Sequence, residues 1–192
     1  MNTLNDISDI VLILKEIMNK REDYLRCFCS KGVQVEGWFK AELLCLLAKL
    51  ELTRQIQGFD REVAFSSGKT RVDFRIELSA ATPSIWLEIK HWLIGYQKSY
   101  KYNSRFYFGD RSSVGIKPDV DRLNQIVHGN KFLLILATSN PGEEEWIKGT
   151  NTFNEKFGPL KLVPLTNPSE FPTFYFLGLL AIPNTDRVEM LT

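Results

Sequence analysis

The segment SIWLEIKHW, residues 84–92, places two charged side chains inside what otherwise looks like a buried strand. Glu88 and Lys90 are two positions apart, so strand alternation puts both side chains on the same face. The flanking residues are large and apolar, as in a strand that is packed on both faces. Burying charge costs free energy unless the charge is paired. The pair therefore marks either a chemical site or an ion pair on a solvated edge strand.

A second carboxylate, Asp73, lies in the alternating segment RVDFRI, residues 71–76. If this segment is the neighbouring strand, Asp73 and Glu88 meet at one edge of the sheet. Two carboxylates repel each other there unless a cation lies between them. Mg²⁺ prefers oxygen ligands and often uses one or two carboxylates together with water and phosphate. Lys90 would point at the same place, where an ammonium can orient an attacking water and balance the charge of a phosphate.

A third carboxylate belongs to the helix predicted for residues 36–52. Glu36 precedes Phe39 by three positions and Leu43 by seven. At roughly 100° per residue, these spacings put Glu36 on the apolar stripe of the helix. Glu42 lies about 90° from the centre of that stripe and is the alternative helix acid. A carboxylate directed at the core needs a partner there.

Periodicity and turn residues predict the elements that position these side chains. We expect a helix over residues 4–25, ended by SKG at 30–32, and a second helix over 36–52. A hairpin with the turn SSGK, residues 66–69, comes before the strand 84–92. Further elements are a helix over 117–129, with Pro118 in its first turn and Gly129 as its cap, a central strand at 131–140 parallel to a neighbour, a helix over 146–157, and strands at 160–165 and 174–182. This order predicts an α/β domain with a mixed sheet.

The ordered set of Glu36, Asp73 and Glu88-Ile89-Lys90 resembles the PD-(D/E)XK nuclease superfamily. The resemblance covers residues 33–140 and implies a restriction-endonuclease-like αβββαβ core, with a central mixed sheet flanked by helices. The chain would be a single nuclease-like domain, 1–192, in which 1–30 is an N-terminal helical extension and 141–192 adds C-terminal strands. Two features depart from the pattern. Val72 stands where the superfamily's name has Pro, and the segment that follows Lys90 is long.

The resemblance also implies roles. Asp73 and Glu88 would hold Mg²⁺, with the backbone carbonyl of Ile89 as a further ligand. Lys90 would assist the water, and Glu36 would complete the catalytic set. The expected function is a magnesium-dependent endonuclease that hydrolyses phosphodiester bonds in DNA, with Mn²⁺ as a substitute ion. The alternative is a catalytically inactive member of the fold that binds nucleic acid or another protein. A homodimer is expected only by analogy with similar nucleases.

Basic and aromatic residues alternate in the long segment after the strand. Lys98, Lys101, Arg105 and Arg111 lie among tyrosines and phenylalanines. This mixture suits phosphate contacts and base stacking, and it also suits packing on the domain or on a second subunit. Lys117, at the start of the next helix, is a further basic residue expected near the site.

Composition excludes several classes of protein. The 192 residues carry 24 basic and 23 acidic side chains, so net charge does not require an acidic or a basic partner. No apolar run approaches the length of a membrane span, and acidic residues precede the first apolar segment, unlike in a secretory signal. SSGKT lacks the first glycine of a phosphate loop, so no nucleotide cofactor is expected. We therefore expect a cytoplasmic protein that does not bind a membrane.

Overall fold

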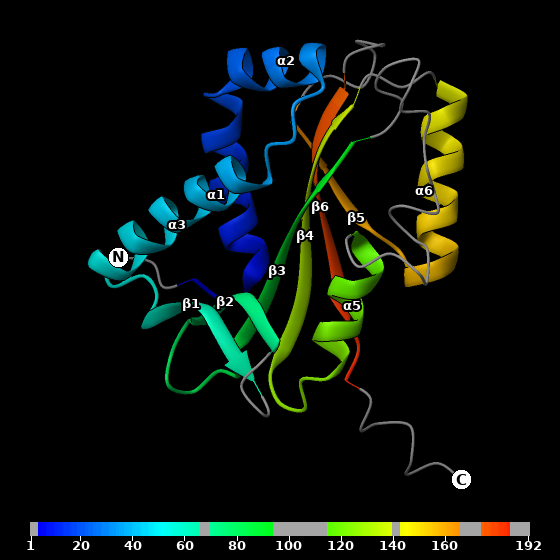
Figure 1. The fold of residues 1–192 in the computed structure, drawn as a ribbon. Coiled ribbons are helices and arrows are strands. Elements are labelled where there is room, and N and C mark those ends of the chain that lie inside the picture. Colours follow the sequence, from blue (N-terminus) through cyan, green and yellow to red (C-terminus); the bar gives the residue numbers. More distant parts are fainter. Residues whose placement is uncertain (1–3, 66–69, 94–114, 140–142, 166–173, 185–192) are drawn as a thin grey trace, which may run out of the picture.

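A mixed six-stranded sheet forms the centre of the computed structural model (Figure 1), which describes residues 4–65, 70–93, 115–139, 143–165 and 174–184. The order of the strands across the sheet is β1-β2-β3-β4-β6-β5. Their bounds are β1 Gly58–Phe65, β2 Thr70–Glu77, β3 Ile85–Trp92, β4 Asn130–Ser139, β5 Lys161–Pro164 and β6 Phe174–Ile182. The α/β class and the mixed sheet are thus confirmed.

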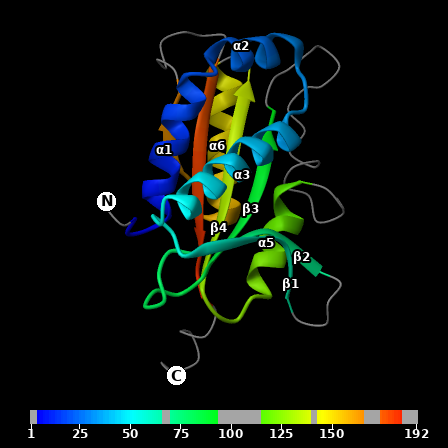
Figure 2. The ribbon, with the colours of Figure 1, turned by 90° about the vertical axis from the view of Figure 1, so that its left-hand side faces the viewer.

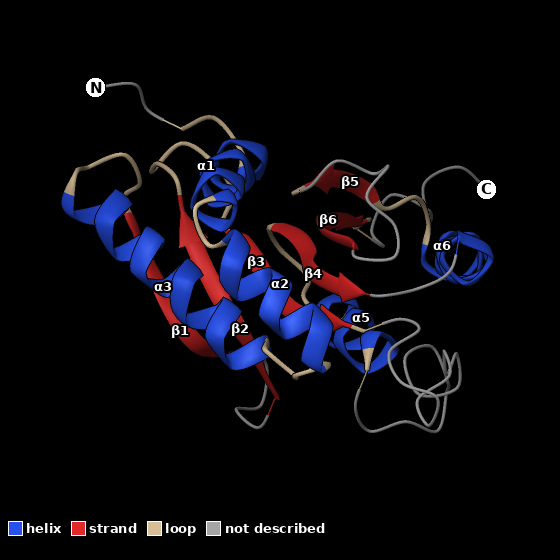
Figure 3. Cartoon of the chain, turned by 90° about the horizontal axis from the view of Figure 1, so that it is seen from above, coloured by secondary structure: helices blue, strands red, loops and turns tan. Residues whose placement is uncertain are grey.

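Helices cover both faces of the sheet (Figures 2 and 3). One face is covered by α1 Ile7–Asn19, α2 Glu22–Lys31 and α3 Glu36–Leu52, and the other by α5 Ile116–Asn124 and α6 Glu143–Phe157. Within the described residues, none of these helices is both long and apolar enough to cross a membrane.

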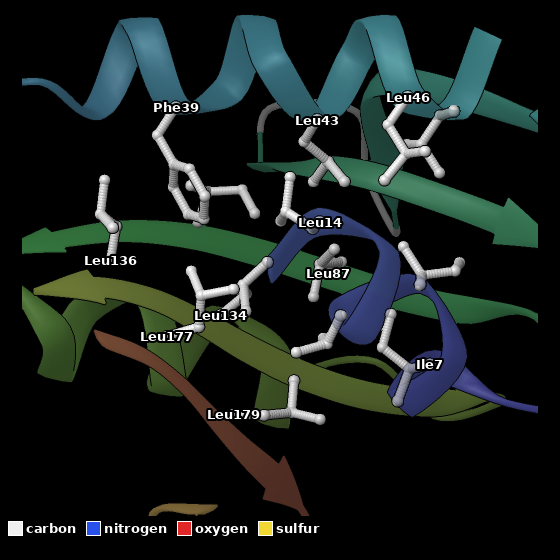
Figure 4. Packing of buried hydrophobic residues seen from close by; sticks show 14 of the residues in the cluster. Ile7, Leu14, Phe39, Leu43, Leu46, Leu87, Leu134, Leu136, Leu177 and Leu179 are labelled. Carbon is white, nitrogen blue, oxygen red and sulfur yellow. The ribbon is translucent and has the colours of Figure 1, made fainter. Parts of the chain in front are cut away.

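Two hydrophobic cores result, one on each face. Side chains of α1 and α3, such as Leu14 and Phe39, pack on Leu87 of β3 and Leu134 of β4 (Figure 4). Trp92, also in β3, belongs instead to the core beneath α5 and α6. The predicted alternation along β3 is therefore confirmed. The face of β3 that carries Ile85, Leu87 and Ile89 fills the core beneath α1 and α3. Glu88 and Lys90 lie on the other face, which is directed at α5.

The pairing of the strands places a gap in the sheet near these charges. β1 and β2 form the predicted antiparallel hairpin, and β4 runs parallel to β3 from Ile85↔Asn130 to Trp92↔Ala137, as expected of a central strand. By contrast, β2 and β3 are paired only from Phe74↔Leu87 to Ile76↔Ile85. Beyond Phe74 and Leu87 the two strands diverge, so Asp73 and Glu88 come directly after the last paired positions.

The N-terminal prediction was wrong in one respect. Residues 4–25 do not form one helix, because α1 ends at Asn19 and α2 begins at Glu22. The chain turns at Lys20 and Arg21, and α2 then crosses the end of the sheet (Figure 1). The turn allows Leu25 and Cys29 of α2 to be buried completely.

The helix predicted for 117–129 is shorter than expected. Pro118 lies in its first turn as predicted, but α5 ends at Asn124 and Gly129 is not its cap. Gly129 has a φ of +102°, and a Cβ atom there would lie 2.6 Å from the carbonyl oxygen of Ser84. Glycine is required because the chain passes close to β3 just before β4 begins. The predicted SSGK turn lies outside the described residues.

His91 joins the sheet to the start of α3. Its side chain is 1% exposed. Its Nε2 atom is hydrogen-bonded to Thr138 Oγ1 of β4, and its Nδ1 atom lies 2.7 Å from Gln34 Oε1. Burial lowers the pKa of the His91 imidazole to about 4, against the opposing charge of Glu36. His91 is thus a packed neutral histidine.

The depressed pKa of His91 predicts a pH-dependent stability. The unfolded chain takes up a proton near pH 6.5 and the folded protein only near pH 4, so the His91 contribution is complete above pH 6.5 and is lost as the pH falls toward 4. Between pH 7 and pH 5 the loss is about 2 kcal/mol. Between pH 7 and pH 5, the free energy of unfolding measured in urea should therefore fall by about 2 kcal/mol more in wild type than in His91→Gln. His128→Gln, at an exposed position, should behave like wild type, and an equal slope in all three proteins would contradict the assignment.

Candidate functional site

Asp73 and Glu88 meet where β2 and β3 diverge. The Ile89 amide donates a hydrogen bond of 2.8 Å to Asp73 Oδ2, so a side chain takes the place of the missing backbone partner. Asp73 is 8% exposed and Glu88 3%. Burial raises the pKa of the Glu88 carboxyl to about 9, and the charge of Asp73 adds to this, while Arg122 acts against it. The two carboxylates therefore share one poorly solvated space, as the sequence predicted.

Lys90 is held between two carboxylates from different helices. Its Nζ atom lies 3.2 Å from Glu36 Oε2 in α3 and 2.8 Å from Asp119 Oδ2 in α5. Burial lowers the pKa of the Lys90 amine, but Asp119 and Glu36 outweigh it, so the pKa is raised overall. Lys90 is thus a fixed ammonium. It can stabilise negative charge, but it is poorly suited to accept a proton.

Glu36 joins Lys90 to a second lysine, one helical turn further along α3. Lys40 Nζ lies 3.0 Å from Glu36 Oε1 and 2.8 Å from Asp73 Oδ1. Burial raises the pKa of Glu36, but Lys90 and Lys40 outweigh it and lower the pKa overall. Burial likewise lowers the pKa of Lys40, and Asp73 and Glu36 raise it overall. Both groups stay ionised, and Lys40 occupies one oxygen of Asp73.

The remaining partners come from α5. Arg122 Nε lies 2.8 Å from Glu88 Oε1, and its Nη2 atom donates to Asp119 Oδ1. Asp119 is 2% exposed. Burial raises the pKa of its carboxyl, with Lys90 and Arg122 acting in the opposite direction. We call the seven side chains the ion-pair network: Glu36, Lys40, Asp73, Glu88, Lys90, Asp119 and Arg122.

The structure brings all four predicted catalytic residues, Glu36, Asp73, Glu88 and Lys90, into this network. Glu42, the alternative helix acid, is instead paired with Arg21 at 3.2 Å. Ile89 contributes its amide to Asp73, and its side chain lies in the core on the opposite face.

Of the predicted nucleic-acid contacts, only Lys117 lies within the described residues. Lys117 pairs with Asp121 on its own helix, at 2.6 Å. The other predicted basic residues lie outside the described residues: Lys98, Lys101, Arg105 and Arg111.

Three members of the network were not predicted from the sequence: Lys40, Asp119 and Arg122. Asp119 had a usable signal, because it lies three positions after Ile116 and four before Leu123, which are both fully buried. That spacing puts it on the apolar stripe, by the argument that identified Glu36. Lys40 and Arg122 could be found only as neighbours of these acids, at spacings that place side chains on one helix face.

The acids of the network are paired with lysine and arginine in this arrangement. Within the described residues, no group of three or more His, Cys, Asp or Glu side chains is arranged so that it could hold a metal ion. The donor set nevertheless fits Mg²⁺, which accepts one or two carboxylates and completes its shell with water. The structural basis of this fit is that Asp73 and Glu88, two buried carboxylates, come directly after the last paired positions of β2 and β3.

Comparisons of the chain with protein-family models, curated proteins and solved structures find no match in any of the three. The function must therefore be inferred from the chemistry of the ion-pair network itself.

The raised pKa of Glu88 predicts that Glu88→Gln stabilises the protein. The folded pKa is about 9 and the ordinary value is 4.5, so the contribution of Glu88 to stability is complete below pH 4.5 and is lost as the pH rises toward 9. A glutamine cannot ionise and avoids this loss. The melting temperature of Glu88→Gln should exceed that of wild type at pH 8, by more than at pH 5. Glu42→Gln is the matched control, since its pair with Arg21 is worth little. A less stable Glu88→Gln at pH 8 would show that Arg122 keeps Glu88 ionised.

Proposed function

We propose that the protein is a magnesium-dependent nuclease with a restriction-endonuclease-like core, which hydrolyses phosphodiester bonds in DNA. One observation carries the proposal: Lys90 is held by Glu36 at 3.2 Å, next to the point where Asp73 and Glu88 share a buried space. The order of elements from α3 through β1, β2, β3 and α5 to β4 matches the αβββαβ order that the resemblance implies.

In this proposal Asp73 and Glu88, with the carbonyl of Ile89, hold Mg²⁺. The bound ion would lower the pKa of a water molecule and offset the charge that develops on the phosphate. Lys40 and Arg122 must then leave the two carboxylates. Because both are cations at the rim of the same space, they become available for charge-assisted hydrogen bonds to phosphate oxygens.

Lys90 would orient the attacking water and neutralise part of the phosphate charge. Its raised pKa rules it out as the group that takes up the water's proton at neutral pH. Asp119 is a positioning residue, since it contacts both Lys90 and Arg122. Hydrolysis would form one phosphorus–oxygen bond to the water oxygen and break the bond to the leaving oxygen. The attacking water gives up one proton to solvent and the leaving oxygen takes up one from solvent, so the protons balance.

Cleavage assays test the proposed activity. Wild type with Mg²⁺ should cut plasmid and single-stranded DNA, and Lys90→Ala should cut at least about 100-fold more slowly, because a fixed charge in the transition state is lost. Lys49→Ala, at the exposed far end of α3, is the matched control and should cut at the rate of wild type. The proposal fails if wild type leaves both DNA and RNA intact with Mg²⁺ and with Mn²⁺.

A specific observation favours a second candidate. The acids of the ion-pair network are already paired with Lys40, Lys90 and Arg122, so the network can persist without a metal ion. This arrangement fits a catalytically inactive module of the same fold, which binds nucleic acid or protein.

Titration calorimetry separates the two candidates. A nuclease site should bind Mn²⁺, and Asp73→Asn should weaken the binding at least about tenfold, because one charged ligand is removed. Asp60→Asn, at an exposed position of β1 where Asp60 pairs with Arg75, should bind as wild type does. If wild type takes up no Mn²⁺ at millimolar concentration, the inactive module is the better description.

A further inference from the structure

A pocket of about 170 Å³ opens directly beside the ion-pair network. It lies between the first turns of α3 and the β1–β2 hairpin, and it shares Lys40 and Asp73 with the network. The other lining residues are Gly37, Ala41 and Leu44 from α3 and Arg61, Glu62 and Phe74 from the hairpin. A nucleic-acid chain whose phosphate reaches Asp73 would therefore have this pocket directly beside it.

Gly37 keeps the helix side of the pocket open. Glycine weakens a helix, and at Gly37 packing does not require it, because a Cβ atom would meet nothing within 4 Å. Ala41 follows one turn later on the same helix face. The two small residues leave room for a group that approaches the α3 backbone next to Lys40.

Glu62 forms the opposite wall in an unusual backbone conformation. Its φ is +53°, in the left-handed region that residues with a side chain seldom adopt. The register of the hairpin continues past it, but Glu62 and Asp73, which lie opposite each other between Arg61↔Phe74 and Val63↔Val72, are not paired. Such strain is a common feature of binding sites, where it directs a side chain toward a ligand.

The chemistry of the walls defines what fits. Ala41, Leu44 and Phe74 offer apolar contact, Glu62 offers a hydrogen-bond acceptor, and Arg61 offers donors. An apolar cavity of about 150 Å³ admits one benzene ring, so the pocket has room for a single six-membered ring. A carboxylate accepts a hydrogen bond from the amino group of cytosine, and a guanidinium can donate to a ring carbonyl oxygen.

We propose that this pocket binds the pyrimidine base, cytosine in preference to thymine, of an unpaired nucleotide next to the phosphate at Asp73. The inference rests on the proposed nuclease function. It narrows the substrate to single strands or to bases displaced from a duplex, because a base in the pocket cannot remain paired.

Fluorescence anisotropy of the full chain with labelled single-stranded hexanucleotides of dC, dT or dA tests the proposal. EDTA is present, so the assay does not depend on cleavage. Wild type should bind dC about tenfold more tightly than dA, the difference expected from one well-held base. Gly37→Leu fills the pocket and should reduce dC binding to the level of dA. Ala48→Leu, an exposed position on the same helix, is the matched control and should bind as wild type does.

A second variant, Glu62→Gln, should remove the preference for dC over dT and leave dT binding unchanged. The pocket is rejected if wild type binds the three oligonucleotides equally, or if Gly37→Leu binds dC as tightly as Ala48→Leu does. These outcomes are distinct from those of the cleavage assays. A protein that cuts DNA without base preference retains the nuclease function and loses the pocket. A protein that prefers dC in this pocket-dependent way but does not cut retains the pocket and loses catalysis.

Discussion

Pairing of the acids with lysine and arginine where β2 and β3 separate is the interaction on which the rest of this structure depends. Four carboxylates and three cations lie where β2 and β3 separate, and each carboxylate has a cation within ion-pair distance. Without those partners, burial of Glu88 or Asp119 would cost several kcal/mol per charge. The network thus allows the sheet to open at one point while hydrophobic cores fill both of its faces.

The network also explains how helices on opposite faces come to serve one site. Glu36 and Lys40 reach it from α3 on one side, and Asp119 and Arg122 reach it from α5 on the other. Lys90 contacts an acid from each helix, Glu36 and Asp119. A well-packed apolar cluster of similar volume is often as stable as a buried ion network, or more so. The raised pKa of Glu88 fits that view, since the ionised form is disfavoured where it lies. A group that costs stability in the folded protein is a candidate for function.

How far the sequence could predict this site depended on periodicity. The alternation of β3 placed Glu88 and Lys90 on one face, and the helical stripe of α3 placed Glu36, because both patterns are set by local geometry. Asp119 obeys the same rule as Glu36 and could have been found by it. The pairing of Lys40 with Asp73 and of Arg122 with Glu88 could not, because it depends on how two helices pack across the sheet. The turn at Lys20 and the role of Gly129 were also not predicted, because both are set by contacts with residues distant in sequence.

The central claim is that Asp73 and Glu88 of the ion-pair network bind a divalent metal ion. The most direct test is to soak a crystal of the protein in manganese and locate the ion by anomalous diffraction. The ion is predicted to lie between Asp73 and Glu88, about 2.0–2.5 Å from an oxygen of each. Lys40 should then have moved from its position 2.8 Å from Asp73 Oδ1. The claim is contradicted if no manganese is bound there and Lys40 and Arg122 remain paired with Asp73 and Glu88.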